Sequence, residues 1–145
     1  MIYGETFSFT DTSVIDCDKD PFVYEGMQVL SHRKDGQLLL SSLQLVLIQS
    51  ERQTSPEGLS GHALEKEMAN AHIANANVLW HLFKTNLIPQ AWEDGRSICF
   101  LGSVFLNGLG GKCIQTLRYG ERGWDIEMRY FDETFTVNDS VVIRK

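Results

Sequence analysis

Three aspartates alternate along the chain at Asp16, Asp18 and Asp20, which is how a calcium-binding loop begins. Alternating carboxylates could converge on a hard cation, because such ions prefer oxygen ligands. The rest of that loop is missing: Pro21 stands where the sharp turn needs glycine, and Met27 stands where a bidentate glutamate is required. The pattern therefore predicts an ordinary acidic loop and no metal site.

Four histidines could bind a metal or transfer a proton, and they are spread along the chain. His62, His72 and His81 lack the i, i+4 spacing with which helical histidines hold zinc. At ~100° per residue they would point in different directions if they shared one helix. His32 stands apart from them in the sequence. We expect surface or half-buried histidines that share no site.

A cysteine nucleophile would need a neighbouring base and a lowered thiol pKa. Cys99 and Cys113 lie in strand patterns, where a small buried thiol is the commoner role. Pairing across the turn between them would place Cys99 near Tyr119 and Cys113 near Phe105, ~20 Å apart along the ladder, so we expect no disulfide. With Cys17 the count is odd, which fits neither a disulfide framework nor a zinc knuckle and indicates a reducing compartment.

The segment 107–111, Asn-Gly-Leu-Gly-Gly, has the composition of a phosphate-binding loop but a different context. Such a loop opens a helix and carries Lys with Ser or Thr, whereas here a strand pattern begins at Lys112. The segment therefore predicts a hairpin turn. The Gly-x-Ser-x-Gly pattern of a nucleophile elbow does not occur either. We accordingly expect no cofactor and assign no catalytic residue.

Length and charge narrow the class of protein. The 145 residues suit one domain, and 43% hydrophobic residues can supply a core without disulfides or metal. The formal charge of −6 argues against nucleic acid as a partner, since nonspecific binding to phosphates depends on clustered Lys and Arg. The sequence shows no secretion signal and no apolar run near the ~20 residues that span a bilayer. We predict a cytoplasmic protein with no membrane partner.

The stretch from Leu59 to Trp92 has a helical pattern, and the other elements are organised around it. Apolar residues recur there at three- and four-residue spacing, which lays them along one stripe of a helix that a sheet must bury. We expect Leu82 and Phe83, which lie on this stripe, to be core residues. The full stripe consists of Leu64, Met68, Ala71, Val78, Leu79, Leu82 and Phe83.

The helical stretch is expected to break near residue 74. A single helix would put Asn75 in the centre of the stripe and point Ile73 toward solvent, whereas Asn75 is a natural N-cap. We therefore predict two helices, over residues 61–71 and 76–86, with Ser60 capping the first. Because the break precedes the second helix, a proline at position 74 is expected to be tolerated.

The first 58 residues have strand patterns. Residues 2–10 are expected to form a short edge strand. Residues 22–33 and 37–49 read as two strands that Asp35-Gly36 joins in a tight hairpin, because this dipeptide accepts positive φ angles. The second of these strands is apolar on both faces, which suits a central position.

The C-terminal part, residues 97–145, is predicted to be a three-stranded meander followed by a final short strand at 141–143. Its strands are expected over residues 97–106, 112–119 and 124–131. The turn after Gly120 sets the register of the last pair. It places Tyr119 opposite Trp124, Leu117 opposite Ile126 and Arg118 opposite Asp125.

Several segments together resemble a group of small bacterial proteins that have no known activity. In that group a capped helix leads into an Ile-Pro-x-x-Trp turn, a [Phe/Trp]-x-Gly-[Ser/Thr]-[Ile/Val] strand and a Trp-rich hairpin. The resemblance spans residues 22–145 and implies the same fold and a bacterial origin, but no catalytic residues. The hairpin departs from the group, since it has less tryptophan. The matching segments are 61–64, 75–79 (NANVL), 87–92 (LIPQAW), 100–104 (FLGSV), 117–119 (LRY) and Trp124.

These patterns predict an α+β fold with a mostly antiparallel sheet. An N-terminal hairpin and the C-terminal meander form the sheet, and the helical pair packs on one face. The single domain comprises an N-terminal β part (1–58), the helical pair (59–92) and the C-terminal meander (97–145).

For function, the absence of a catalytic set, a basic patch and a cofactor loop favours a small non-enzymatic binding or regulatory protein that acts through protein contacts. Its expected contact residues are the large amphipathic aromatics Trp92, Tyr119, Trp124 and Tyr130. One alternative is a small hydrolase or metal-dependent enzyme that uses residues 16–20 with His32. Another is a structural subunit of a homo-oligomer, for which an exposed apolar strand edge would be the sign.

Overall fold

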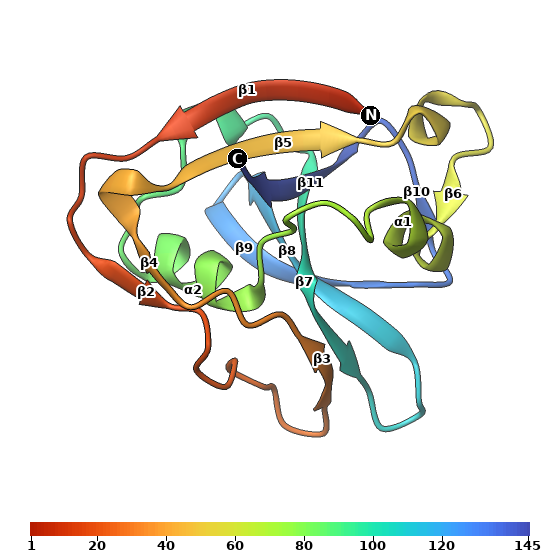
Figure 1. Ribbon diagram of the computed structural model, residues 1–145. Helices are drawn as coiled ribbons and strands as arrows, with labels where there is room; N and C mark the ends of the chain where they lie inside the picture. Colours follow the sequence, from red (N-terminus) through yellow and green to blue (C-terminus); the bar gives the residue numbers. More distant parts are fainter.

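The computed structural model describes residues 1–145 and has an α+β fold, with a seven-stranded sheet and two α-helices (Figure 1). Two small two-stranded sheets, β2 with β4 and β6 with β10, flank the main sheet. The main sheet contains β1 (Ile2–Ser8), β3 (Gln28–His32), β5 (Gln44–Gln49), β7 (Ser97–Leu106), β8 (Lys112–Gly120), β9 (Gly123–Tyr130) and β11 (Asp139–Arg144). The remaining elements are β2 (Val14–Asp16), β4 (Gln37–Leu39), β6 (Leu59–Ser60), β10 (Thr134–Phe135), the helices α1 (Gly61–Glu67) and α2 (Ala76–Lys84), and 3₁₀ turns at Leu40–Ser42, Glu51–Thr54 and Gln90–Trp92.

The strands of the main sheet run in the order β1, β5, β11, β7, β8 and β9, and β3 also pairs with β7. All neighbours are antiparallel except β11 and β7, which are parallel where Asp139–Val141 lies beside Ser97–Cys99. The predicted α+β class and mostly antiparallel sheet are confirmed, but the sheet is mixed. The reason is the final strand, which returns to the centre between β5 and β7 and does not extend the meander.

The predicted N-terminal hairpin is wrong. Gly36 has the positive φ of a turn, yet the strands on either side separate: β3 pairs with β7, and β4 pairs with β2. Gly36 is held elsewhere, because its N–H donates to Asp18 Oδ1 (2.9 Å) and its carbonyl accepts the N–H of Cys17 (2.9 Å). The Asp35-Gly36 turn thus connects to the acidic loop.

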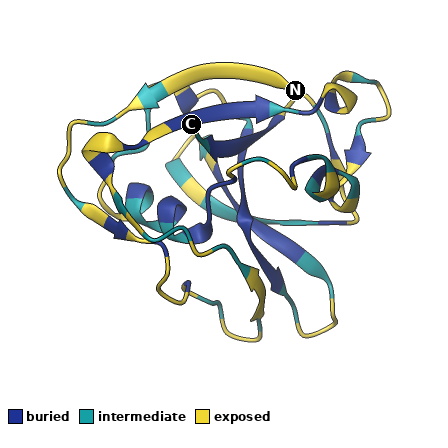
Figure 2. Cartoon of the chain, in the orientation of Figure 1, coloured by how far each residue is buried: buried dark blue, intermediate teal, exposed yellow.

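The apolar run at 37–49 is also not one strand. A 3₁₀ turn at Leu40–Ser42 divides it, and only β5 joins the main sheet. There β5 lies between β1 and β11, so its predicted central position is confirmed. Figure 2 shows β5, β11 and β7 largely buried, whereas β1 at the sheet edge is exposed.

The C-terminal meander forms as expected. Tyr119 lies opposite Trp124, Leu117 opposite Ile126 and Arg118 opposite Asp125. Between β7 and β8 the register shifts by an irregularity in β7 between Phe100 and Phe105. Cys113 therefore pairs with Phe105 as predicted, but Cys99 pairs with Thr116 and not near Tyr119.

The two helices begin where their caps predict. The side chain of Ser60 accepts the N–H of Ala63, and the side chain of Asn75 accepts those of Asn77 and Val78. Both helices end earlier than expected. Neither is long and apolar enough to cross a membrane.

The helices cover opposite faces of the sheet, so the prediction that both pack on one face is wrong. Side chains alternate between the faces of a strand. In β5, Leu45 and Leu47 belong to the cluster that contains Val78, Leu79 and Leu82 of α2. Their neighbours Val46 and Ile48 belong to the cluster that contains Leu64 and Met68 of α1.

The chain passes from one face to the other through the sheet, between β11 and β7. The N–H of Ala74 donates to Val142 O of β11 (2.9 Å), and the N–H of Gly102 in β7 donates to Ala74 O (2.9 Å). Ile73 forms a bridge with Ile143. Residue 74 is therefore bonded like a strand residue, which explains the break between the helices.

Candidate functional site

The aspartates of the acidic loop do not converge with His32. Asp16 Oδ1 accepts the N–H of Asp18 (3.1 Å), while Asp18 Oδ1 accepts that of Gly36. His32 uses both ring nitrogens: Nδ1 contacts Ser103 Oγ (2.7 Å) and Nε2 contacts Cys17 O (3.1 Å). No group of three His, Cys, Asp or Glu side chains is placed to hold a metal ion. This geometry gives no support to the enzyme alternative built on these residues.

Asn75 and Asn77 bind the acidic loop to the start of α2. The buried amide of Asn75 caps the helix with its oxygen and donates its Nδ2 to Cys17 O (3.0 Å) and Arg33 O (2.7 Å). Asn77 Nδ2 donates to Asp16 O (3.0 Å) and Lys19 O (2.8 Å). The two asparagines therefore have a positional role, since they fix the loop that borders the pocket described below.

His81 and Ser13 form a contact of the kind that catalysis could use. His81 Nε2 lies 2.8 Å from Ser13 Oγ. The nearby carboxylate, Asp11, accepts from Ser13, and these hydrogen bonds lower the pKa of Asp11. A catalytic triad requires the acid on the far nitrogen of the histidine, where it selects the tautomer. Here the serine is central, so the order does not match a triad.

The three cysteines are free and buried. Burial raises the pKa of the Cys17 thiol to about 12 and that of Cys113 to about 11, and it also raises the pKa of Cys99. A thiol, unlike a thiolate, is a poor nucleophile. These side chains therefore serve packing rather than covalent chemistry.

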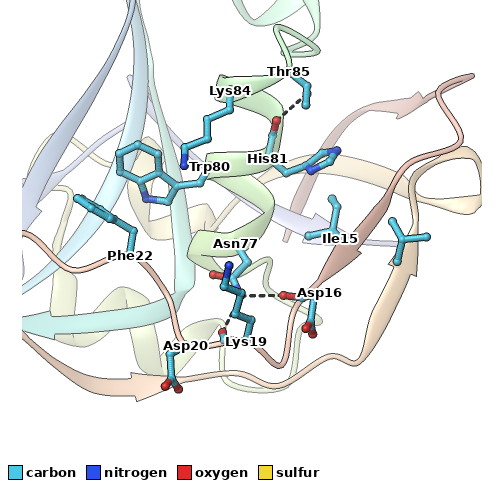
Figure 3. A pocket seen from close by; sticks show the side chains of 11 residues that line it. Ile15, Asp16, Lys19, Asp20, Phe22, Asn77, Trp80, His81, Lys84 and Thr85 are labelled. Carbon is cyan, nitrogen blue, oxygen red and sulfur yellow. Dashed lines mark hydrogen bonds between the residues drawn. The ribbon is translucent and has the colours of Figure 1, made fainter.

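A pocket of about 370 Å³ lies between α2 and the segment 14–22. In Figure 3, Phe22 and Trp80 lie on one side of it and His81 points to the other side. Two lysines and two aspartates line the pocket, so its charges offset one another and select no charged ligand. The lining residues are Val14, Ile15, Asp16, Lys19, Asp20, Phe22, Asn77, Trp80, His81, Lys84 and Thr85.

Four aromatic rings contact one another beside this pocket. The centroid of Trp80 lies 4.9 Å from that of Phe22, 6.2 Å from that of Tyr24 and 6.0 Å from that of Phe83. Trp80 Nε1 donates to Gln115 Oε1 (3.0 Å), which fixes the indole over the sheet. Lys84 Nζ lies 5.6 Å from the centroid of the same ring. Phe22 is 52% exposed, so the cluster opens to solvent.

A second pair of rings continues this surface onto the β8–β9 hairpin. Tyr119 and Trp124 meet edge to face with centroids 5.2 Å apart. Both line a second pocket, of about 560 Å³, which Phe83 and Ile88 also line. Phe83 thus joins the two groups. We call the combined surface the aromatic face: Phe22, Tyr24, Trp80, Phe83, Tyr119 and Trp124.

The four aromatics predicted as contact residues have different positions. Tyr119 and Trp124 are half-buried and lie on the aromatic face. Tyr130 is half-buried and packs against the small cluster around Phe105 and Cys113. Trp92 is fully buried and meets Phe7 edge to face, so it cannot contact a partner.

Sequence reasoning missed four residues of the aromatic face: Phe22, Tyr24, Trp80 and Phe83. Trp80 carried a usable signal, because this large aromatic side chain lies off the apolar stripe of α2. Phe83 lies on the stripe but is only half-buried, whereas Leu82 is fully buried as predicted.

Comparison of the chain with protein-family models, with curated proteins and with solved structures gives no match. The assignment of function therefore depends on the geometry described above.

Proposed function

We propose that this protein is a small non-enzymatic binding protein that contacts another protein through the aromatic face. The observation that carries the proposal is the continuity of six partly exposed rings across α2, the segment before β3 and the β8–β9 hairpin. Contiguous exposed apolar surface is uncommon on monomeric proteins and marks interaction sites. Tryptophan and tyrosine contribute most to interface energies.

Packing of the core supports the same proposal. The cores on both faces of the sheet are filled by other residues, including the fully buried Trp92, Phe100 and Phe131. Truncation of exposed rings such as Phe22 would therefore leave the core largely intact. Trp80 and Phe83 pack against this core with part of each ring, and the remainder of each ring is exposed on α2.

The net charge of the chain and its free cysteines indicate what kind of partner it binds and where. An acidic chain disfavours phosphate backbones, so we infer a protein partner and not a nucleic acid. Three free buried cysteines support a cytoplasmic location, where thiols stay reduced. The resemblance to small bacterial proteins supports a bacterial origin.

Site-specific photo-crosslinking tests the proposal. A benzophenone amino acid replaces Phe22 or Tyr119 on the aromatic face, and Leu109 or Val137 at control positions. Both controls are exposed, Leu109 by 97% and Val137 by 52%, and both lie off the aromatic face. After irradiation in cells, we expect a discrete crosslinked protein from the two face positions and none from the controls.

Equal crosslinking at all four positions, or none at the face positions, would contradict the proposal. A product with twice the mass of the chain would instead identify a homo-oligomer. The open edge of β9 beside the aromatic face makes that outcome a real second candidate.

A further inference from the structure

Strand β9 is the last strand of the main sheet, and it pairs with β8 alone. Antiparallel pairing directs the backbone groups of alternate residues toward one neighbour or the other. The N–H of Phe131 donates to Lys112 O, so residue 131 faces β8, as do the residues at odd numbers before it. Trp124, Ile126 and Met128 therefore direct their N–H and C=O groups away from the sheet.

These outward groups have no partner in the protein. At the end of the strand the outward groups of Tyr130 are occupied, because its N–H donates to Glu133 Oε2 and its carbonyl accepts the N–H of Glu133. No such contact occurs at Trp124, Ile126 or Met128. Trp124, Ile126 and Met128 thus offer unpaired backbone N–H and C=O groups along the edge of β9. At Tyr130 the contacts with Glu133 end this series of free groups.

The edge is also regular. β9 pairs with β8 from Gly123 to Tyr130 with no register shift. The opposite edge of the sheet, β1, has an irregularity between Tyr3 and Thr6. Natural proteins use bulges, prolines, short strands and charged side chains to prevent pairing at an edge. β9 has no bulge and no proline, and its charged side chains, Asp125, Glu127 and Arg129, all lie on one face.

Side chains on the two faces of β9 specify what could pair there. On the α2 side, Trp124, Ile126 and Met128 are half-buried and apolar. On the other side, Asp125 and Glu127 form no ion pair. Arg118 lies opposite Asp125 in β8, but its Nε donates to Gly95 O (3.1 Å).

We propose that an extended segment of the partner protein, in which apolar residues alternate with lysine or arginine, adds to β9 as a further strand. Its backbone completes the free ladder, its apolar side chains lie beside Trp124, Ile126 and Met128, and its cations lie beside Asp125 and Glu127. Strand addition is an established mode of peptide recognition, in which alternate side chains give specificity. This inference rests on the proposed function, because the added segment would border the aromatic face.

Model peptides test it on the unaltered protein. The probe is a capped peptide of about seven residues that alternates valine and lysine, and the matched control replaces each lysine by glutamate. We expect saturable binding of the lysine peptide by fluorescence anisotropy and binding of the glutamate peptide at least roughly tenfold weaker. Absence of saturable binding of the lysine peptide up to ~1 mM overturns the proposal.

Backbone methylation separates strand addition from simple charge attraction. One peptide carries N-methyl groups on its valine amides, and a second carries them on its lysine amides. In an added strand only alternate N–H groups face β9, so only one of the two sets of methyl groups blocks the hydrogen bonds to β9. Loss of binding with one set and retention with the other supports strand addition. An equal effect of both sets, or no effect of either, overturns it.

Variants of the protein give an independent test. Met128→Pro removes an outward N–H without removing a bond to β8, while Met128→Ala removes the side chain and keeps the N–H. We expect the proline variant to bind the lysine peptide about tenfold more weakly than the alanine variant. The double variant Asp125→Lys with Glu127→Lys should instead prefer the glutamate peptide. If Met128→Pro does not fold, the charge-reversal variant and the methylated peptides still test whether the peptide adds to β9 as a strand.

The two proposals fail in different ways. Crosslinking at Phe22 and Tyr119 that persists in the Met128→Pro variant would retain the aromatic face as an interface and reject strand addition. Loss of the crosslinks at both Phe22 and Tyr119 in the Met128→Pro variant would show that the partner needs the free edge of β9. Peptide binding without crosslinking at the face would leave β9 as a strand-pairing site and reject the proposed interface.

Discussion

Gly102 of β7 and Ala74 of the crossing segment are in direct backbone contact, with the Gly102 N–H donating to Ala74 O at 2.9 Å. A Cβ atom on Gly102 would lie 2.6 Å from that oxygen and 2.8 Å from the Cα of Asn75. The chain can therefore pass between β11 and β7 only where β7 has no side chain. This contact positions the N-terminus of α2 and, through it, the aromatic face.

Gly102→Ala should destabilise the protein, because neither backbone can give way without loss of its hydrogen bonds. We expect a loss of ~1–3 kcal/mol in the free energy of unfolding, measured by urea titration. Gly120→Ala is the matched control, since a Cβ there meets nothing within 4 Å. Equal stability of the two variants would contradict the packing described for the crossing.

Asn75→Ala should cost ~2–4 kcal/mol in the free energy of unfolding. It removes the helix cap and the amide that donates to the carbonyls of Cys17 and Arg33, of which only Cys17 O keeps another contact, with His32 Nε2. Asn75→Ser retains a capping oxygen but not the two donated bonds, so an intermediate loss is expected. A serine variant as stable as the native protein would show that the bonds to the loop contribute nothing.

Ala74→Pro should be strongly destabilising, contrary to the expectation from the sequence that it would be mild. The helix does break there, but the N–H of Ala74 bonds to Val142 O, and proline has no N–H to donate. We expect a lower unfolding midpoint for Ala74→Pro than for Ala74→Gly, which keeps the donor. The reverse order would argue against the bond to β11.

Leu82→Ala and Phe83→Ala should differ in their effects. Leu82 is fully buried beneath α2, so its truncation should cost ~2–5 kcal/mol in the free energy of unfolding. Phe83 is half-buried, and its truncation should cost less while it disrupts the aromatic face. Thermal or urea unfolding of both variants compares them directly, and a larger loss for Phe83 would mean that its ring belongs to the core.

The thiols should make stability depend on pH above about 9. Burial raises the pKa of Cys113 from 9.0 to about 11 and that of Cys17 to about 12. As pH rises through this window, the unfolded chain releases thiol protons that the folded chain retains. The free energy of unfolding should then fall, by at most ~1.4 kcal/mol per pH unit for each thiol.

Urea unfolding at pH 8 and pH 10.5 measures this dependence. A variant with alanine at Cys17, Cys99 and Cys113 should lose less stability between the two pH values than the native protein. An identical pH dependence of the two proteins would show that the thiols do not cause the effect.

Local signals in the sequence determined the local parts of this fold. Ser60 and Asn75 marked the two helix starts, because a capping side chain needs only the N–H groups of the next turn. The short turn after Gly120 set the register of β8 and β9, including Tyr119 opposite Trp124. In β9, Trp124, Ile126 and Met128 alternate with Asp125 and Glu127, and this alternation marks the apolar side of the strand. Two of the four predicted contact residues lie on the aromatic face.

Tertiary structure alone decided which elements meet. The sequence around Asp35-Gly36 is compatible with a hairpin, but Gly36 bonds to Cys17 and Asp18 and the strands take other partners. Helical periodicity shows that a helix has a buried stripe, but it does not show which face of the sheet covers that stripe. The sequence therefore did not reveal that α1 and α2 lie on opposite faces. Trp92 lies in a short polar turn, yet the long-range packing against Phe7 buries it. Trp80 is half-buried because its indole donates to the buried Gln115 of β8, and this contact is a property of the assembled sheet and helix rather than of either segment.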